Sequence, residues 1–228
     1  MDELTEKIKK MWDDRAKDYV EDWQATLGEK YLRSLEIKTM IKYIKCLKPK
    51  RVLDVGCGNG YSTKIYATKF PEVQFTGMDY SGEMIKNANK SPVINCEFFV
   101  GDVLQVDSFP EGNFDVIITQ RCLQNLPDYD KQYVAIKNLL AKKSISGVLL
   151  LMECSKDGVK QLNDMRIKLG RKPIEGIEPW HNNFFDDRKL TNDFGANIIH
   201  FVSTYMFLSR IISSRIARLG YLLPQIGK

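Results

Sequence analysis

A glycine-rich turn after a strand-like run is the part of the chain with the clearest chemical meaning. The run VLDVGCGNGYS, residues 52 to 62, places Asp54 just before glycines 56, 58 and 60. Glycines in such a turn let a ligand approach the backbone closely. The GxGxxG spacing of a dinucleotide site fails because Tyr61 occupies the third glycine position, and no GK[ST] follows for a phosphate loop. Asp54 would also repel phosphates, so the turn indicates a ligand with positive charge nearby.

Two further acidic residues follow strand-like runs. Asp79 closes VQFTGMD, 23 residues beyond the first glycine, where an acid can bind both hydroxyls of a ribose. Asp102 follows EFFVG and is placed to accept a hydrogen bond from an adenine amino group, with the Val103 backbone donating to the ring and Tyr80 lying against it. Asp79 or Asp102 alone could simply cap a turn. Three acids at three successive strand ends, Asp54 included, instead suit S-adenosylmethionine, which carries an ammonium and a sulfonium and no phosphate.

The elements that must position these residues alternate between strand-like and helix-like runs. This alternation predicts a doubly wound, Rossmann-like α/β fold with a mostly parallel sheet covered on both faces. The strands are expected at 51–55, 73–79, 96–102, 114–120, 147–154 and 195–204, and the helices at 61–70, 81–90 and 127–140. Ser81 is expected to cap the second of these helices. No seventh strand is visible, although such sheets normally have one.

The chain is expected to form one domain with two additions around its core. Residues 1–45 form a helical cap, 46–154 the cofactor-binding core, and 155–228 a substrate cap with the C-terminal elements. The last part includes an insertion after the fifth strand, at 155–190, with a charged helix and an irregular stretch. Because ligands of doubly wound folds bind beyond the carboxyl ends of the strands, both additions are expected to cover that edge.

Four motifs in order, VLDVGCGNG, GMDYS, VGDV and FDVIIT, resemble those of class I S-adenosylmethionine-dependent methyltransferases over about residues 50 to 155. The segment MWDDRAKDY also resembles a helix that lies over the cofactor in small-molecule members, although aromatic residues seven apart occur as often in a helix core. The resemblance implies cofactor contacts from Trp12, Tyr19, Asp54, Gly56, Gly58, Asp79, Tyr80, Met84, Asp102, Val103 and Gln120.

The methyl acceptor is less clearly encoded. A hydroxyl acceptor needs a base, and the chain has two histidines. His181 lies in the polar loop EPWHNNFFDD of the proposed cap and is the candidate base, whereas His200 lies in an apolar run and is expected to be structural. Arg121, after the fourth strand, is either a structural ion-pair partner or a clamp for a phosphate or carboxylate. Tyr205 and Arg210 are further candidates for substrate binding.

Other features limit the acceptor classes. The segment after the fourth strand lacks the [DNS]PP[YFW] motif of amino-methylating nucleic-acid enzymes and the glutamate pair of protein-arginine enzymes, and no metal site is expected. Segments such as QRCLQNLP and PWHN look like a bacterial subgroup associated with surface polysaccharides, which implies O-methylation of a sugar or a small phosphorylated group. A non-catalytic cofactor-binding module and an RNA methyltransferase are the alternatives, the latter supported only by a net charge of +5.

The cysteines and the N-terminus bear on localisation. The five cysteines are scattered and form no CxxC pair, which favours a reducing compartment over a disulfide framework. The N-terminal segment is a charged helix without the apolar core of a signal peptide. Three arginines interrupt the most apolar late segment, so no membrane span is expected there. A cytoplasmic protein is therefore predicted.

Overall fold

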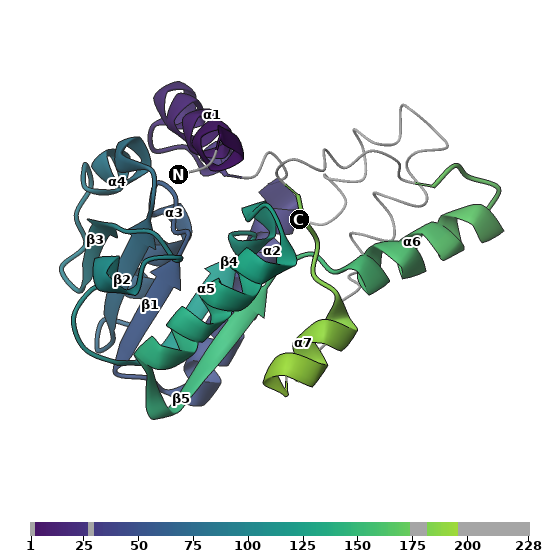
Figure 1. Cartoon of the computed structure of the whole chain (residues 1–228). Coiled ribbons are helices and arrows are strands. Elements are labelled where there is room, and N and C mark those ends of the chain that lie inside the picture. Colours follow the sequence, from purple (N-terminus) through teal and green to yellow (C-terminus); the bar gives the residue numbers. More distant parts are fainter. Residues whose placement is uncertain (1–2, 27–29, 174–181, 196–228) are drawn as a thin grey trace.

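A computed structural model describes residues 3–26, 30–173 and 182–195. Its sheet has five strands in the order β3-β2-β1-β4-β5, and every pair is parallel. The strands are β1 Arg51–Val55, β2 Gln74–Asp79, β3 Cys96–Val100, β4 Phe114–Gln120 and β5 Lys143–Met152. The predicted doubly wound parallel sheet is therefore confirmed (Figure 1).

Helices connect the strands and flank the sheet. They are α1 Glu3–Tyr19, α2 Lys30–Leu47, α3 Tyr61–Lys69, α4 Gly82–Ala88, α5 Tyr129–Lys142, α6 Lys156–Lys168 and α7 Asp187–Phe194, with short 3-10 turns η1 Trp23–Ala25, η2 Val106–Ser108 and η3 Leu123–Asn125. Ser81 caps α4 as predicted, because its hydroxyl accepts a hydrogen bond from the Met84 amide. Among the described helices, none combines the length and the apolar composition that a membrane span needs.

The two faces of the sheet are buried by different helices. Val52 and Ile118 point to the face covered by α2 and α3. Leu53 and Ile117, their neighbours in sequence, point to the opposite face, where α5 and α7 pack. Because strand side chains alternate between faces, strands buried on both sides need continuous apolar runs, which explains the sequence of β4.

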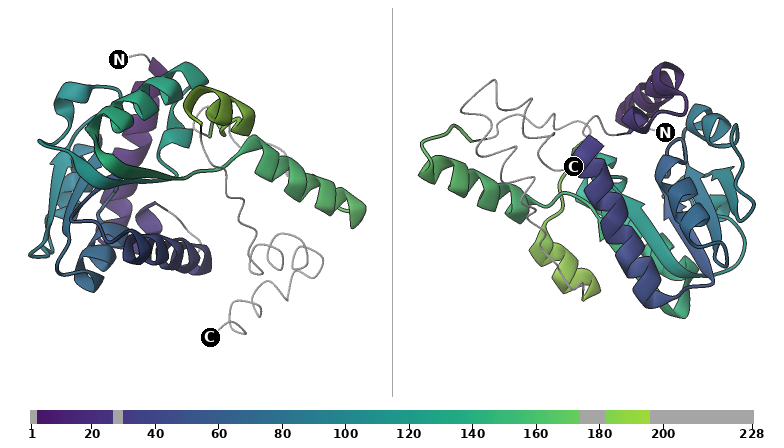
Figure 2. Two further views of the ribbon diagram at one scale, coloured as in Figure 1. Left: turned by 90° about the horizontal axis from the view of Figure 1, so that it is seen from below. Right: turned by 180° about the vertical axis from the view of Figure 1, so that it is seen from behind.

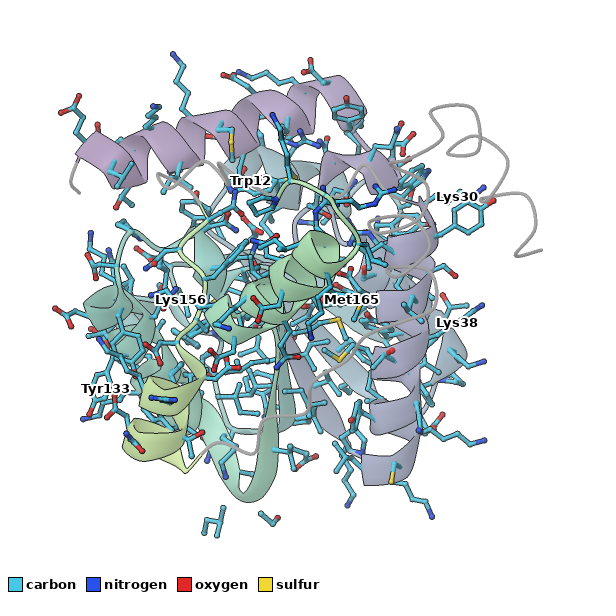
Figure 3. The ribbon with its side chains drawn as sticks, turned by 90° about the vertical axis from the view of Figure 1, so that its right-hand side faces the viewer. Trp12, Lys30, Lys38, Tyr133, Lys156 and Met165 are labelled. Carbon is cyan, nitrogen blue, oxygen red and sulfur yellow. The ribbon has the colours of Figure 1, made fainter. Side chains whose placement is uncertain are left out.

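The N-terminal helix lies over the edge of the sheet at which the strands end. Figure 1 shows α1 above the sheet and beside α4, and Figure 3 places Trp12 beneath α1, between this helix and the sheet. The Asn87 side-chain amide donates to the Ala16 carbonyl over 2.7 Å, and the Ser81 hydroxyl bonds the Asp13 carboxylate. These bonds fix α1 on α4. The second helix of the predicted cap at 1–45, α2, instead packs on one face of the sheet.

The segment after β4 differs from the sequence-based expectation in three places. The strand β5 begins at Lys143, four residues earlier than predicted. A helix, α7, follows the stretch predicted to be irregular, because Asp186 caps it by accepting from the amides of Arg188 and Lys189. The adjacent acids of FFDD are expected to be solvated, as is usual on a loop, but Asp187 is 7% exposed.

The remaining part of this region extends away from the core. All three views show α6 projecting from the sheet (Figures 1 and 2), and it contributes no buried residue. Most of the predicted sixth strand at 195–204, including His200, lies outside the described residues. Within the described chain, β5 forms one edge of the sheet.

Candidate functional site

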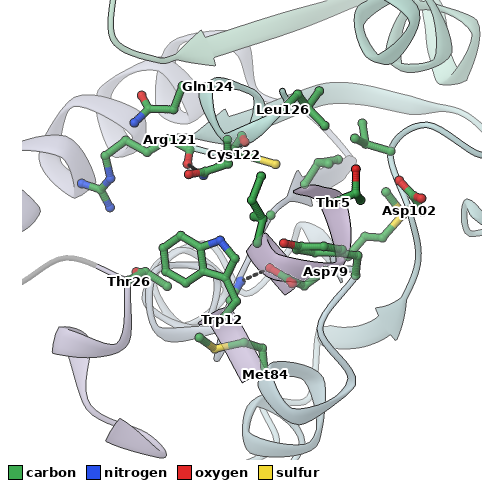
Figure 4. Close-up of a pocket in the computed structure, with 18 of the residues that line it drawn as sticks. Thr5, Trp12, Thr26, Asp79, Met84, Asp102, Arg121, Cys122, Gln124 and Leu126 are labelled. Atoms are coloured by element: carbon green, nitrogen blue, oxygen red, sulfur yellow. Dashed lines mark hydrogen bonds between the residues drawn. The ribbon is translucent and has the colours of Figure 1, made fainter. Parts of the chain in front are cut away.

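A cavity of about 330 Å³ lies between α1 and the carboxyl ends of the strands. This is the place where ligands bind in doubly wound folds. Figure 4 shows Trp12, Thr26 and Met84 on one side of it and Arg121, Cys122 and Gln124 on the other. Ten residues that the sequence selects line this cavity: Trp12, Gly56, Gly58, Asp79, Tyr80, Met84, Asp102, Val103, Gln120 and Arg121.

The glycine turn forms part of the cavity wall with a backbone that only glycine adopts easily. Gly56 and Gly58 have φ angles of +73° and +56°. A Cβ atom at Gly58 would lie 2.6 Å from the Thr26 Cγ2 atom, and one at Gly56 would lie 2.4 Å from the Cys122 Sγ atom. The glycines are therefore required both by the turn and by the segments packed against it.

The amide groups of this turn are already used within the protein. The Gly56 and Cys57 amides donate to the Met78 carbonyl, the Gly60 amide donates to the Cys57 carbonyl, and the Gly58 amide donates to Asp79. A phosphate site needs such amides pointing at the ligand. These four amides are therefore not available to form a phosphate cradle, in agreement with the interpretation of the sequence.

Asp79 presents a carboxylate to the cavity from the end of β2. One oxygen accepts from the Gly58 amide and the other from the Ser81 amide, each over 2.9 Å. Each oxygen keeps acceptor capacity for a ligand hydroxyl. Burial raises the pKa of Asp79 to about 6, although the two backbone amides counteract this shift. Asp79 is therefore suited to hold a diol whenever it is ionised.

Asp54 is located behind the turn and does not line the cavity. Its side chain is 2% exposed and accepts a hydrogen bond from the Thr63 hydroxyl over 2.6 Å. Burial raises the pKa of Asp54 to about 7, with the neighbouring Asp79 carboxylate adding to the shift. A direct contact between Asp54 and a ligand stays a prediction that the cavity lining does not support.

The far end of the cavity is formed by the segment after β3 and by Tyr80. Asp102 accepts hydrogen bonds from the Leu104 amide over 2.9 Å and from the Gln105 side chain over 3.5 Å. The Tyr80 hydroxyl is buried without a hydrogen-bond partner among the described residues, and burial raises its pKa. Tyr80 therefore lines the cavity, while its hydroxyl is shielded from solvent.

Arg121 forms an ion pair at the mouth of the cavity. Its Nη1 atom lies 2.8 and 2.7 Å from the two carboxylate oxygens of Glu36 in α2. Arg33, 5% exposed, lies near this pair, and burial lowers the pKa of Arg33 to about 10, with the Arg121 charge adding to the shift. Arg121 also has a positive φ angle of +53°. The sequence left open whether this arginine is structural or binds an anion; the structure gives it a structural partner and also a place in the cavity lining.

Of the remaining predicted site residues, only Tyr19 belongs to the described part of the chain. Tyr19 does not line the cavity and instead packs near Met84 and beneath the Arg15 guanidinium, 5.3 Å from its ring centroid. His181, Tyr205 and Arg210 lie outside the described residues, so their roles stay predictions.

Several lining residues escaped the sequence analysis. They come from α1 and from the segment after β4: Thr5, Ile8, Met11, Arg15, Cys122, Gln124, Asn125, Leu126 and Pro127, together with Thr26 and Asn182. The motif LQNLP was visible directly after a strand, and its position at the ligand-binding edge was the signal for these contacts. For the residues of α1, the only signal in the sequence was the helical spacing of Ile8 and Met11, which places them on one face of the helix.

Comparison with known proteins identifies the family. A family model described as "Methyltransferase domain" matches residues 47–170, which is more than half of the 228 residues. The chain is 29% identical over 143 residues to malonyl-[acyl-carrier protein] O-methyltransferase of Bacillus anthracis, covering 62% of this chain and 51% of that protein. It is 31% identical over 173 residues to trans-aconitate 2-methyltransferase of Enterobacter sp. (strain 638), covering 71% and 66%. The chain thus spans less than two thirds of the length of these relatives.

Solved structures agree on the fold. The chain matches a structure titled "DhpI-SAM-HEP complex" with a TM-score of 0.61 and 20% identity, covering 84% of this chain and 87% of that one. It matches human N-acetylserotonin methyltransferase, solved with S-adenosylmethionine, with a TM-score of 0.53 and 19% identity, covering 68% and 43%. With the order of the strands and the position of the cavity, these matches confirm the predicted class I methyltransferase fold, and the family match shows that the chain belongs to the methyltransferase domain family.

Proposed function

We propose that this protein is an S-adenosylmethionine-dependent methyltransferase. The observation that carries the proposal is the combination of a turn whose four amides at residues 56, 57, 58 and 60 are engaged within the protein and the Asp79 carboxylate at the cavity. Together they disfavour a phosphate and favour a nucleoside with two hydroxyls. Relatives of this chain are named as methyltransferases, and two structural neighbours carry S-adenosylmethionine in their titles.

The residues lining the cavity fit this cofactor. Asp79 would hold the ribose, Asp102 and the Val103 backbone the adenine, and the glycine turn with Gln120 the methionine end. Tyr80 supplies the unpaired hydroxyl at the same end as Asp102, and Met84 and Trp12 supply apolar surface. When bound, S-adenosylmethionine supplies an activated methyl group. The protein then has to align the acceptor with it, to exclude water and, for a hydroxyl acceptor, to remove a proton.

For the acceptor, we propose a small hydroxylated molecule such as a sugar or a phosphorylated group. Three neutral amide side chains, Gln124, Asn125 and Asn182, line the cavity. Asn125 donates to the Arg121 and Cys122 carbonyls, whereas the NH₂ group of Gln124 has a second hydrogen beyond its bond to Asn182 and can donate it to a hydroxyl or phosphate oxygen. His181 is the proposed base, on the sequence alone. The link to surface polysaccharides rests only on the resemblance of the sequence.

A carboxylate acceptor is the second candidate. Arg121 lines the cavity, and an arginine can hold a carboxylate through two of its nitrogens. Trans-aconitate 2-methyltransferase, a relative of this chain, is named for such an acid. A carboxylate is already ionised at neutral pH and needs no base. His181→Ala would therefore abolish transfer to a hydroxyl acceptor and leave transfer to a carboxylate unchanged.

The proposal is tested in two steps. Calorimetry with S-adenosylhomocysteine first measures whether the cavity binds the cofactor product. Labelled S-adenosylmethionine is then used to screen sugars, nucleotide-linked sugars, phosphorylated metabolites and small carboxylic acids for methyl transfer. Absence of binding would refute a cofactor site, whereas binding without transfer to any acceptor would favour a non-catalytic module. Transfer to RNA with a steep dependence on salt would favour the RNA enzyme instead.

A further inference from the structure

The loop that separates β4 from α5 carries much of the cavity wall opposite Trp12. Arg121, Cys122 and Gln124 belong to it and lie along one side of the cavity (Figure 4). The loop leaves the sheet where the Arg121 amide donates to the Met152 carbonyl, and Arg121 itself has a left-handed backbone with φ +53°. That conformation is unfavourable for a residue with a Cβ atom, so neighbouring contacts must stabilise it.

One carboxylate holds the backbone directly after Arg121. Glu153 directly follows β5, and its Oε1 atom accepts from the Thr119 hydroxyl over 2.7 Å and from the Cys122 and Leu123 amides over 3.1 and 3.2 Å. Its Oε2 atom accepts from the Gln124 amide over 3.2 Å. Three consecutive amides of the loop thus converge on a single side chain 29 to 31 residues away.

The partners of Glu153 suit its charged form. The three amides can only donate, and hydrogen bonds to a carboxylate are stronger than those to a neutral acceptor. Burial raises the pKa of Glu153, while the Thr119 hydroxyl and the amides oppose this shift. No salt bridge involving Glu153 occurs among the described residues. A carboxylate that is shielded from water and accepts several backbone amides restricts the position of that backbone more than a surface contact does.

The loop is further tied to the segment that follows α6. The Gln124 side chain accepts from the Cys154 amide over 3.0 Å and donates to the Asn182 side chain over 3.2 Å. The Asn183 amide donates to the Gln124 carbonyl over 2.7 Å. Asn182 also lines the cavity. Moving Gln124 would consequently displace two side chains of the wall at once.

We propose that Glu153 is a positioning residue for the methyl acceptor. It touches neither Asp79 nor the glycine turn, and it acts through the loop that carries Arg121, Cys122 and Gln124. This role rests on the proposed function, because it assigns that wall to the acceptor. Loss of the Glu153 charge therefore impairs methyl transfer more than it impairs cofactor binding.

The first test uses Glu153→Gln and needs no acceptor. Glutamine keeps the shape but places an NH₂ group opposite an amide donor of the loop. Hydrogen exchange, followed by mass spectrometry, is expected to accelerate by about tenfold at the Cys122–Gln124 amides. Asp115→Asn is the matched control, because Asp115 accepts from the Lys50 and Arg51 amides at the opposite edge of the sheet. It should leave exchange at Cys122–Gln124 unchanged.

The second test separates acceptor from cofactor. In Glu153→Gln the dissociation constant of S-adenosylhomocysteine should stay within about fivefold of the wild type, while kcat/KM for an acceptor from the screen falls by about 100-fold, as expected for a displacement near 1 Å. Should Glu153→Gln fail to fold, Thr119→Val is the second variant, because it removes the hydroxyl that donates to Glu153. It is expected to lower kcat/KM for the acceptor by about threefold.

The possible outcomes are distinguishable. Unchanged exchange in Glu153→Gln, or a loss of S-adenosylhomocysteine affinity as large as the loss in kcat/KM, overturns the proposal. Failure of the wild type to bind S-adenosylhomocysteine would refute the proposed function instead, and the exchange comparison would still report whether Glu153 holds the loop.

Discussion

Replacing Asp79 by asparagine tests the carboxylate that lines the proposed cofactor site. In the protein, the two oxygens of Asp79 accept the Gly58 and Ser81 amides, and both can accept a further hydroxyl. Asparagine has nearly the same shape but only one oxygen. Its NH₂ group would face one of the two backbone amides, and its remaining oxygen is uncharged.

The expected loss of affinity follows from these contacts. A hydrogen bond to a charged group contributes about 1.5–3 kcal/mol and one to a neutral group about 0.5–1.5 kcal/mol. Weakening two ribose contacts therefore costs about 2–4 kcal/mol. This value includes the unfavourable contact between the NH₂ group of the new asparagine and a backbone amide. This corresponds to an increase of roughly 30- to 1,000-fold in the dissociation constant of S-adenosylhomocysteine.

The dependence on pH provides an independent check. Since burial raises the pKa of Asp79 to about 6, protonation below that pH removes the charge that the ribose contacts need. Wild-type affinity should fall below pH 6 by up to about tenfold per pH unit. Asp54 titrates nearby with a pKa of about 7, but it is present in both proteins. The ratio of wild-type to Asp79→Asn affinity should consequently shrink as the pH falls. The effect of Asp54 titration largely cancels from this ratio.

Isothermal calorimetry with S-adenosylhomocysteine between pH 5 and 8 measures both effects. Asp115→Asn serves as control, because its side chain also accepts two backbone amides but lies at the other edge of the sheet. The reasoning is refuted if Asp79→Asn binds within threefold of the wild type at pH 7.5, or if the affinity ratio does not change with pH.

Three further substitutions test other parts of the site. Asp54→Asn should stabilise the ligand-free protein by roughly 2–4 kcal/mol at pH 8 and by almost nothing near pH 4. The reason is that the raised pKa of about 7 makes ionisation of Asp54 costly as the pH rises between these values. Urea unfolding at both pH values measures this difference in stability. Gly58→Ala should weaken S-adenosylhomocysteine binding by more than about tenfold. Gly58 has a φ angle of +56°, and the new Cβ would lie 2.6 Å from a threonine methyl carbon. Gly82→Ala is the control in the same calorimetry and should have no effect, because a Cβ there would meet nothing within 4 Å. Glu36→Gln should lower the free energy of unfolding by about 3 kcal/mol, because it leaves Arg121 without its buried partner; equal urea midpoints would contradict this.

The core of the fold was predictable because its signals are local. Each of β1, β2 and β4 is a short apolar run that ends at a turn, and Asp79 and Asp102 follow their strands directly in the sequence. Parallel strands bring their carboxyl ends to one edge, so order along the chain was enough to place these residues together. Eight of the ten predicted site residues that line the cavity do so for this reason, whereas Trp12 and Met84 belong to α1 and α4.

The remainder depends on contacts between distant segments. The Arg121–Glu36 pair joins residues 85 apart, and nothing in either local sequence identifies the other as partner. Glu153 looks like an ordinary acid after a strand, and only the folded loop brings three amides to it. The helix α7 was missed because its caps, Asp186 and Gly195, enclose a polar segment without a strong apolar pattern.

The sequence-based exclusion of a phosphate at the turn relied on Asp54, but the structure supports that exclusion through other groups. The charge of Asp54 was taken to exclude phosphate from the turn, yet the side chain lies behind the turn and bonds Thr63. Two other features disfavour a phosphate: four amides of the turn are engaged within the protein, and the carboxylate that lines the cavity belongs to Asp79. Because Asp54 and Asp79 raise the cost of ionising one another, a bound cation would stabilise both charges together. Cofactor binding should therefore release protons near pH 7, and calorimetry in buffers of different ionisation enthalpy would measure their number.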